Sequence, residues 1–326
     1  MKKNLKIIFL ILVLVVVNLF TCMSSEPVSI NNSEIFPETG TQDTEETAEV
    51  IAPTRAEIVM KALMRSYPDL IEKVEFLNDD WALFLRGTWY YYAGGRLLPE
   101  SEIENTANYR SMQFYNYPAE LPEWVARTTE EARRYSSWST GSNTRTQSQV
   151  QVRRSNFFLD SIWQASTRVE TERRLSSFNF LGKQIKVHQA IHEKLTVIER
   201  QIRAAAAAEP EVQVWITGIG NLESYGWRNI AITDSRSYHS YGLAVDILPR
   251  SLGGKQTYWL WSSQAGRDWW NVSYSERYHP PSSVIKIFES YGFIWGGKWQ
   301  QFDTMHFEYR PEILILAGFD VTGLTD

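Results

Sequence analysis

Two short segments near the end of the 326-residue chain carry residues that could bind a metal ion and act on water. The first, Ser-Tyr-His-Ser-Tyr-Gly-Leu-Ala-Val-Asp, contains His239 and Asp246, and the second, Asp-Thr-Met-His, contains Asp303 and His306. A catalytic zinc site needs three protein ligands, an open position for water and a nearby general base. Two imidazoles, one carboxylate ligand and a second carboxylate meet this requirement, so the pattern favours a zinc hydrolase.

The residues between His239 and Asp246 can bring these two side chains to one point. Gly242 and Ala244 are small, so the backbone can turn tightly after His239 and pack closely before Asp246. We expect His239 at the loop end of a strand and Asp246 within the strand that follows. Either segment alone is also consistent with a buried, hydrogen-bonded histidine and surface carboxylates, so both interpretations stay open at this point.

The elements that must position these residues are short. Alternating apolar residues predict strands at 212–217 and 242–249, and helical spacing predicts a helix at 282–291. Short strands interspersed with helices predict a compact α+β domain at 209–326.

Upstream of this domain the pattern is mainly helical. The spacing of apolar residues predicts a helix over 56–74, kinked or divided at Pro68, and a helical region over 157–208 with one break near 176–180. An aromatic block at 81–92 predicts a pair of strands. We therefore expect residues 56–208 to form a mostly helical subdomain, whose role the sequence does not indicate.

The beginning of the chain has the features of an export signal. Lys2 and Lys3 precede an apolar run at 7–20, and the only cysteine, Cys22, follows directly, as in a bacterial lipobox. We expect residues 1–22 to be a signal peptide with a lipobox, with an ordinary signal peptide or an uncleaved anchor as the alternative. Residues 23–55 are rich in Ser, Thr, Glu and Pro, which predicts a disordered acidic tether. The protein is thus expected in the periplasm or cell envelope, held to the membrane by a lipid.

The overall composition narrows the classes of function. A hydrophobic content of 43% and 13 Trp are compatible with a folded core. A net charge of -5 and a pI near 5.7 lack the basic footprint of proteins that bind nucleic acids, so we expect no nucleic-acid partner. A single cysteine excludes disulfides within this chain.

The two segments and the residues between them resemble one family, over residues 211–312. The resemblance includes Trp-Gly-Gly-Lys-Trp at 295–299 and Asp-Thr-Met-His-Phe-Glu at 303–308. The family is that of the zinc peptidases that cleave peptidoglycan stem peptides, which comprises D-alanyl-D-alanine carboxypeptidases and dipeptidases and L-alanyl-D-glutamate endopeptidases. It implies a small antiparallel sheet with flanking helices, of the D-Ala-D-Ala peptidase/hedgehog-like type, here with an N-terminal helical extension.

The resemblance also implies a Zn²⁺ cofactor and a role for each site residue. The implied zinc ligands are His239, Asp246 and His306, and the implied catalytic base is Asp303. An Asp as base, with Trp-Gly-Gly-x-Trp before it, resembles the endopeptidase branch. The arginine that polarises the substrate carbonyl in the family has no clear counterpart, so Arg228 is the candidate here and Arg236 the alternative.

These observations together predict an exported zinc metallopeptidase that hydrolyses peptide bonds in peptidoglycan stem peptides. The L-alanyl-D-glutamate endopeptidase type is favoured, and D-alanyl-D-alanine carboxypeptidase is the alternative. An interpretation from another class is a cell-wall-binding lipoprotein that keeps the fold but does not turn over substrate.

Another pair of histidines, His188 and His192, lies four residues apart on a predicted helix, as in the zincin motif. That motif needs a glutamate after the first histidine, and Gln189 cannot take a proton from water at neutral pH. We therefore interpret both as ordinary histidines of a helix face. The Trp-rich insert at 259–270 is predicted to be a loop on the substrate side.

Overall fold

The computed structural model describes residues 52–112, 114–128, 130–131, 153–230 and 235–324. The predicted signal peptide with Cys22, and the tether up to residue 51, lie outside these ranges and stay predictions. Within the described ranges, no helix has the length and apolar character needed to cross a bilayer.

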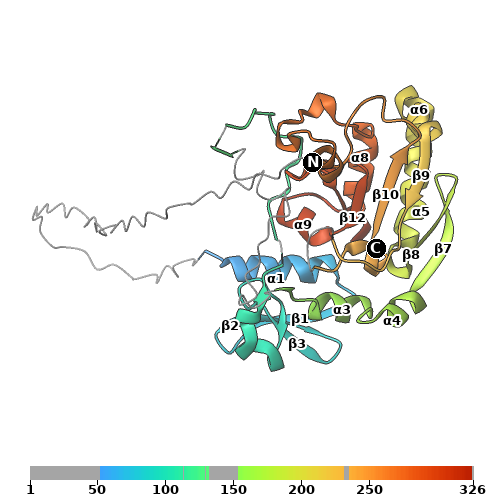
Figure 1. The fold of residues 1–326 in the computed structure, drawn as a ribbon. Coiled ribbons are helices and arrows are strands. Elements are labelled where there is room, and N and C mark those ends of the chain that lie inside the picture. The colour runs from blue at the N-terminus through green and yellow to red at the C-terminus, as the bar shows by residue number, and fades with distance from the viewer. Residues whose placement is uncertain (1–51, 113, 129, 132–152, 231–234, 325–326) are drawn as a thin grey trace, which may run out of the picture. The chain divides into compact units, whose positions relative to one another are not determined.

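The described chain begins with a helix that packs near a small sheet (Figure 1). The Thr54 side chain accepts a hydrogen bond from the Glu57 N–H and so caps α1, which ends before Pro68. An antiparallel sheet in the order β1-β2-β3-β4 follows, so the predicted strand pair in the aromatic block is confirmed. The bounds are α1 (Arg55–Ser66), β1 (Ile71–Leu77), β2 (Asp80–Leu85), β3 (Thr88–Tyr91), β4 (Leu98–Pro99) and η1 (Glu100–Asn108).

The next part contains helices on either side of a hairpin. The helical region predicted over 157–208 is interrupted at the predicted break near 176–180, where the antiparallel pair β7–β8 begins, and its second part is one long helix, α5. The four apolar residues spaced along α5 are fully buried, as their spacing predicts: Ile191, Leu195, Ile198 and Ile202. The bounds are β5 (Tyr109–Arg110), β6 (Arg153–Arg154), α3 (Phe157–Trp163), α4 (Arg168–Arg173), β7 (Leu175–Phe180), β8 (Lys183–His188) and α5 (Gln189–Ala208).

The strand predicted at 212–217 is wrong, because these residues belong to helix α6 (Pro210–Gly218). Pro210 occupies the first turn, where its missing N–H costs nothing. Val212 and Trp215, three residues apart, are buried on one side, whereas Val214 is 70% exposed. The alternation of apolar and polar residues is thus compatible with one buried helix face.

The C-terminal part is built on a second antiparallel sheet in the order β11-β12-β10-β9. The strand predicted at 242–249 and the helix predicted at 282–291 are confirmed as β10 and α8, and the α+β fold class is confirmed with them. The bounds are β9 (Ile219–Glu223), η2 (Tyr238–Tyr241), β10 (Ala244–Pro249), α7 (Trp259–Gln264), η3 (Trp269–Asn271), η4 (Tyr274–Glu276), α8 (Ser282–Ser290), β11 (Phe293–Trp295), η5 (Gly296–Lys298), β12 (His306–Tyr309), α9 (Pro311–Leu316) and η6 (Thr322–Leu324).

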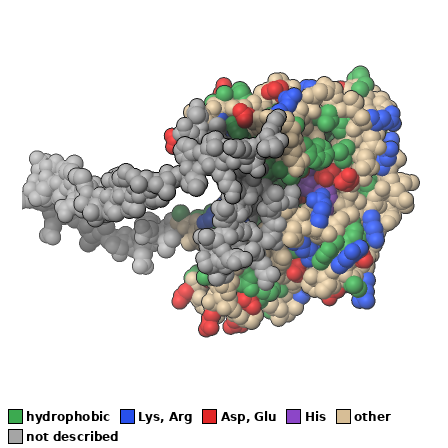
Figure 2. Space-filling model, viewed as in Figure 1, with side chains coloured by type: hydrophobic (Ala, Val, Ile, Leu, Met, Phe, Trp, Pro, Cys, Tyr) green, Lys and Arg blue, Asp and Glu red, His purple; other side chains and the backbone are tan. Residues whose placement is uncertain are grey.

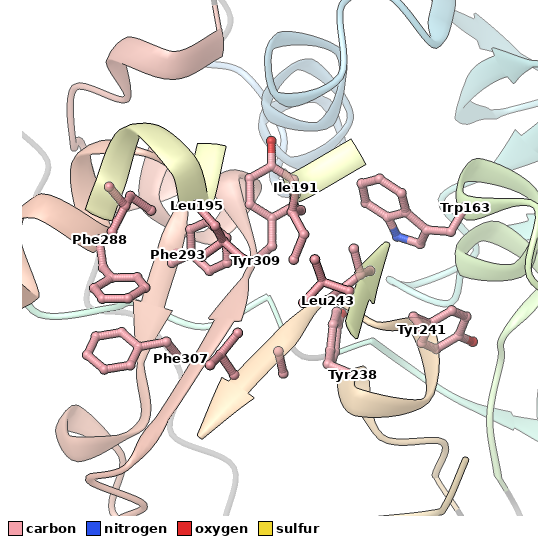
Figure 3. Close-up of a cluster of buried hydrophobic side chains, with 14 of the residues drawn as sticks. Trp163, Ile191, Leu195, Tyr238, Tyr241, Leu243, Phe288, Phe293, Phe307 and Tyr309 are labelled. Carbon is pink, nitrogen blue, oxygen red and sulfur yellow. The ribbon is translucent and has the colours of Figure 1, made fainter. Parts of the chain in front are cut away.

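One face of this sheet packs against α5 and α8 (Figure 3). Phe307 of β12 stacks on Phe288 of α8 with ring centroids 4.0 Å apart, and Tyr309 of β12 belongs to the same buried cluster as Leu195 of α5. The same buried cluster includes Leu63 of α1. The segments before and after residue 208 therefore share one core, and the described part of 56–208 contains strands as well as helices, in contrast to the mostly helical subdomain expected there.

Candidate metal centre

The register between β10 and β12 places the predicted carboxylate and histidine ligands side by side. Asp246 pairs directly with His306, and the next pair along, Val245 with Phe307, points to the helix-covered core. Side chains alternate between the two faces of a strand. The Asp246–His306 face is therefore the one turned away from the core, and Glu308 shares it.

His239 reaches the same point from the tight turn η2. Gly242 ends this turn with a φ of 70°, which favours glycine. A Cβ atom on Gly242 would come within 2.6 Å of the Leu175 Cδ2 atom and 2.8 Å of the His188 nitrogen. The small residue that the sequence places after His239 is thus required by both the turn and the approach of the β7–β8 hairpin.

The three donor atoms of the predicted ligands converge. His239 Nε2 lies 3.2 Å from Asp246 Oδ1 and 3.2 Å from His306 Nδ1, and His306 Nδ1 lies 2.8 Å from Asp246 Oδ1. All three side chains are buried, and they form a group that could hold a metal ion. Ligands at 2.0–2.1 Å from a tetrahedral zinc ion are about 3.3 Å from one another, so this donor set fits zinc with small adjustments.

The outer nitrogen of each histidine is held by an oxygen. His239 Nδ1 donates to the Ser224 carbonyl at 2.5 Å, and His306 Nε2 lies 3.1 Å from Glu308 Oε2. Such partners fix the ring orientation and leave the other nitrogen free to bind metal. Sequence reasoning assigned no role to Glu308, although a position two residues after His306 on a strand already indicates the same face.

The charged groups of this cluster shift one another's pKa values. Burial would raise the pKa of Asp246, but the His239 and His306 imidazoles outweigh burial and hold this pKa well below its usual range. Burial would likewise lower the pKa of His306, but its hydrogen bonds to Asp246 and Glu308 raise it well above the ordinary value. The two carboxylates beside His306 therefore favour its protonated form.

Asp303, the predicted base, is brought to the site by the Trp-Gly-Gly-Lys-Trp segment. Its backbone N–H donates to the Gly296 carbonyl, and a Cβ on Gly296 would lie only 2.5 Å from the Asp303 carbonyl oxygen. Asp303 Oδ1 is buried and has no hydrogen-bond partner among the described residues. Burial first, and then the Asp246 carboxylate, raise the pKa of Asp303 to about 8. A buried carboxyl group with one unpaired oxygen is suited to take up and release a proton.

The two candidate arginines have different surroundings. Arg236 is buried, with its guanidinium bonded to Asp160 Oδ1 at 2.9 Å and to Thr171 and backbone carbonyls, so it supports the fold. Arg228 is exposed and lines a cavity of about 510 Å³ together with His239, and its charge acts to lower the pKa of Asp303. Of the two, only Arg228 faces the site.

The upstream histidines do not form a metal site. His188 caps α5, accepting the Ala190 N–H at Nδ1, and its Nε2 lies 3.0 Å from the Trp163 carbonyl. His192 bonds to Ser176 and stacks on Phe178. Both are structural, as predicted, although His188 stands at the helix start and not on its face.

The Trp-rich insert has a small core of its own. Trp259 and Trp269 are buried in it, with ring centroids 5.0 Å apart, and they pack against Phe302 beside Asp303. Trp261 is 46% exposed. Most of the aromatic surface in this insert is thus used for packing.

Comparison with known families agrees with this geometry. Residues 231–309 match the family model described as D-alanyl-D-alanine carboxypeptidase, and this range contains the three clustered donors and Asp303. This segment is therefore similar to a peptidase family. The resemblance to the zinc peptidoglycan peptidases is thereby confirmed over the segment that carries the site.

A separate match lies outside this segment. Residues 59–114 match a model described only as a domain of unknown function. The searches of curated proteins and of solved structures returned no match for the chain.

Proposed function

We propose that the protein is an exported zinc metallopeptidase that hydrolyses peptide bonds in peptidoglycan stem peptides. One observation carries the proposal: three buried donor atoms converge within the segment that matches a peptidase family, and Asp303, which has an unpaired carboxyl oxygen, interacts electrostatically with two of these ligands. A binding protein without turnover has no need of that carboxylate, because an unpaired buried polar atom costs stability.

In this proposal His239, Asp246 and His306 hold the zinc ion. When bound, zinc supplies Lewis acidity, which lowers the pKa of water from 15.7 to about 7 and polarises a carbonyl group. Asp303 accepts the proton of the attacking water and delivers it to the leaving amine. Arg228, which lines the cavity together with His239, would stabilise negative charge on the substrate carbonyl oxygen.

The cavity beside His239 supports a substrate that carries a carboxylate near the bond to be cut. Lys186 of β8 and Arg228 line it, against one acid, Glu223. The β7–β8 hairpin, which carries Lys186, is held beside this cavity by two hydrogen bonds. The Tyr225 N–H donates to the Lys186 carbonyl, and the Lys186 N–H donates to the Ser224 hydroxyl. In the space-filling view, histidine atoms reach the surface among acidic and basic side chains (Figure 2).

Stem peptides carry such a carboxylate on D-glutamate and at the terminal D-alanine. The cavity is therefore compatible with cleavage of either the L-alanyl-D-glutamate or the D-alanyl-D-alanine bond. The endopeptidase type is favoured by the resemblance of the Trp-Gly-Gly-Lys-Trp and Asp303 segments to that branch. Mass spectrometry of digested muropeptides separates the two. Release of L-alanine-terminated fragments supports the endopeptidase, and loss of a terminal D-alanine supports the carboxypeptidase.

The same digestion tests the enzyme against the cell-wall-binding alternative. Wild-type protein should cleave muropeptides, and Asp303→Asn should retain zinc but lose about 10²- to 10⁴-fold in rate, the range of general base catalysis. If the wild type retains muropeptides on a column without cutting them, a binding function replaces the enzymatic one.

Export and lipidation belong to the proposal as well, on the strength of the apolar run and Cys22. Cys22→Ala should shift the protein from the membrane fraction to the soluble exported fraction. An unchanged distribution would contradict the lipid anchor.

A further inference from the structure

A line of buried charged side chains leads from the candidate ligand His306 away from the site. Glu308 Oε2 lies 3.1 Å from His306 Nε2, and Glu308 Oε1 lies 3.5 Å from Arg310. The Arg310 Nε–H donates to Glu312 Oε1, and the Tyr67 hydroxyl donates to Glu312 Oε2 at 2.7 Å. All four residues beyond His306 are at most 7% exposed.

Each carboxylate in this line uses one oxygen toward Arg310 and the other toward a different partner. Glu308 turns its second oxygen to the metal ligand, and Glu312 turns its second oxygen to Tyr67. Taking charges out of water is costly unless each is paired and hydrogen-bonded. Arg310 pairs with both Glu308 and Glu312. The position of Glu308 therefore depends on how Glu312 holds Arg310.

The last member comes from a distant part of the chain. Tyr67 is the residue that ends α1, Pro68 follows it, and its ring packs edge-on against Trp163 at 5.5 Å. Helix α1 packs along α9, which carries Glu312 (Figure 1). Tyr67 lies within the segment that matches a domain of unknown function.

We propose that Tyr67, Glu312 and Arg310 are positioning residues that hold Glu308 against His306, so that the N-terminal segment tunes the zinc affinity of the peptidase site. The inference rests on the proposed function, because it takes His306 to be a zinc ligand. In this arrangement the segment around α1 fixes the far end of the hydrogen-bonded line that orients this ligand.

The test is the zinc dissociation constant of the purified full chain, measured by competition with a chelator of known affinity. Removing a partner that orients a ligand directly costs about 10- to 100-fold in metal affinity. Tyr67→Phe acts from further away, so we expect a loss of about 2- to 30-fold, the range of mutations within a coupled network. Glu312→Gln should weaken zinc binding at least as much.

Tyr117→Phe is the matched control. Tyr117 is also buried, and its hydroxyl donates to Glu289 at 2.6 Å, but that acid pairs with Lys298 and not with Arg310. We expect this variant to bind zinc within about twofold of wild type while lowering the melting temperature of the metal-free protein at least as much as Tyr67→Phe. The Tyr117 hydroxyl also accepts a hydrogen bond from the Trp295 N–H, so its removal breaks two buried hydrogen bonds and that of the Tyr67 hydroxyl breaks one. A merely structural role for Tyr67 would change the melting temperature and leave the zinc affinity unchanged.

The outcomes separate the inference from the proposed function. A wild type that binds zinc tightly, together with Tyr67→Phe and Glu312→Gln variants that bind it equally tightly, overturns the positioning role. A wild type that binds no zinc overturns the proposed function itself. If Tyr67→Phe does not fold, Glu312→Gln decides the question by the same measurement.

Discussion

Replacing Asp303 by Asn should make the metal-free protein more stable while removing its activity. The pKa of Asp303 is raised from 3.8 to about 8 by burial and by the neighbouring Asp246 carboxylate. Between pH 3.8 and pH 8 the folded protein therefore keeps a proton that the unfolded chain releases. Stability falls with rising pH wherever the folded state binds more protons, so this group destabilises the fold progressively over that window.

The size of the effect follows from the same values. At pH 7 the unfolded chain is about three pH units above the ordinary pKa of this group, and each unit corresponds to 1.36 kcal/mol. The cost of keeping Asp303 in place is therefore about 4 kcal/mol as an upper value. Asn is a neutral group of the same shape, so Asp303→Asn removes this cost. About 4 kcal/mol corresponds to roughly 10 °C in melting temperature for a domain of this size.

The measurement is thermal unfolding of metal-free wild type and Asp303→Asn between about pH 4 and pH 9, which spans the two pKa values. We expect the variant to melt higher at neutral pH, with a gap that widens up to about pH 8 and then levels. Asp320→Asn, at an exposed position, is the control and should change little. A metal-free Asp303→Asn variant that melts at or below the wild-type temperature at neutral pH would refute the reasoning.

Three further outcomes follow from the site. Gly242→Ala should destabilise the fold by at least about 1 kcal/mol in denaturant titrations, because it combines a positive φ with a clash against Leu175; an unchanged midpoint would contradict this. Lys186→Gln should raise KM for acid-bearing muropeptides and leave kcat nearly unchanged; equal kinetics would remove the cavity from substrate binding. Zinc binding at neutral pH should release between about one and two protons, because the pKa values of His306 and Asp303 are raised; calorimetry in buffers of different ionisation enthalpy measures the number, and a release of none would be incompatible with these shifts.

The sequence predicted the site more fully than the elements around it. His239, Asp246 and His306 come together because a tight turn and two paired strands bring them there, and the small residue Gly242 already indicated the turn. The prediction of a strand at 212–217 was wrong because alternating apolar residues over six positions also fit a helix with one buried face. Only tertiary contacts decide between a strand and a helix in such a short segment.

What the sequence could not predict are partners far apart along the chain. The contact of Tyr67 with Glu312 joins residues 245 positions apart, and no local pattern indicates it. Arg228 and Arg236 were both candidates until burial distinguished them, since pairing of Arg236 with Asp160 depends on the packing of α3. Long-range pairing is set by the whole fold, whereas turn chemistry and strand register are set within a few residues.

The charges buried around the site explain why a divalent cation suits it. Two carboxylates, Asp246 and Asp303, lie beside the two imidazoles, and the only other acid against the ligands, Glu308, is already shared with Arg310 among the described residues. Without a cation, the cluster compensates by keeping protons on Asp303 and His306, as their raised pKa values indicate. A doubly charged ion would replace those protons, leave His306 neutral as a ligand, and allow Asp303 to ionise as a base. The same arrangement that makes Asp303 unfavourable in the metal-free protein therefore makes it ready to accept a proton once the cation is bound.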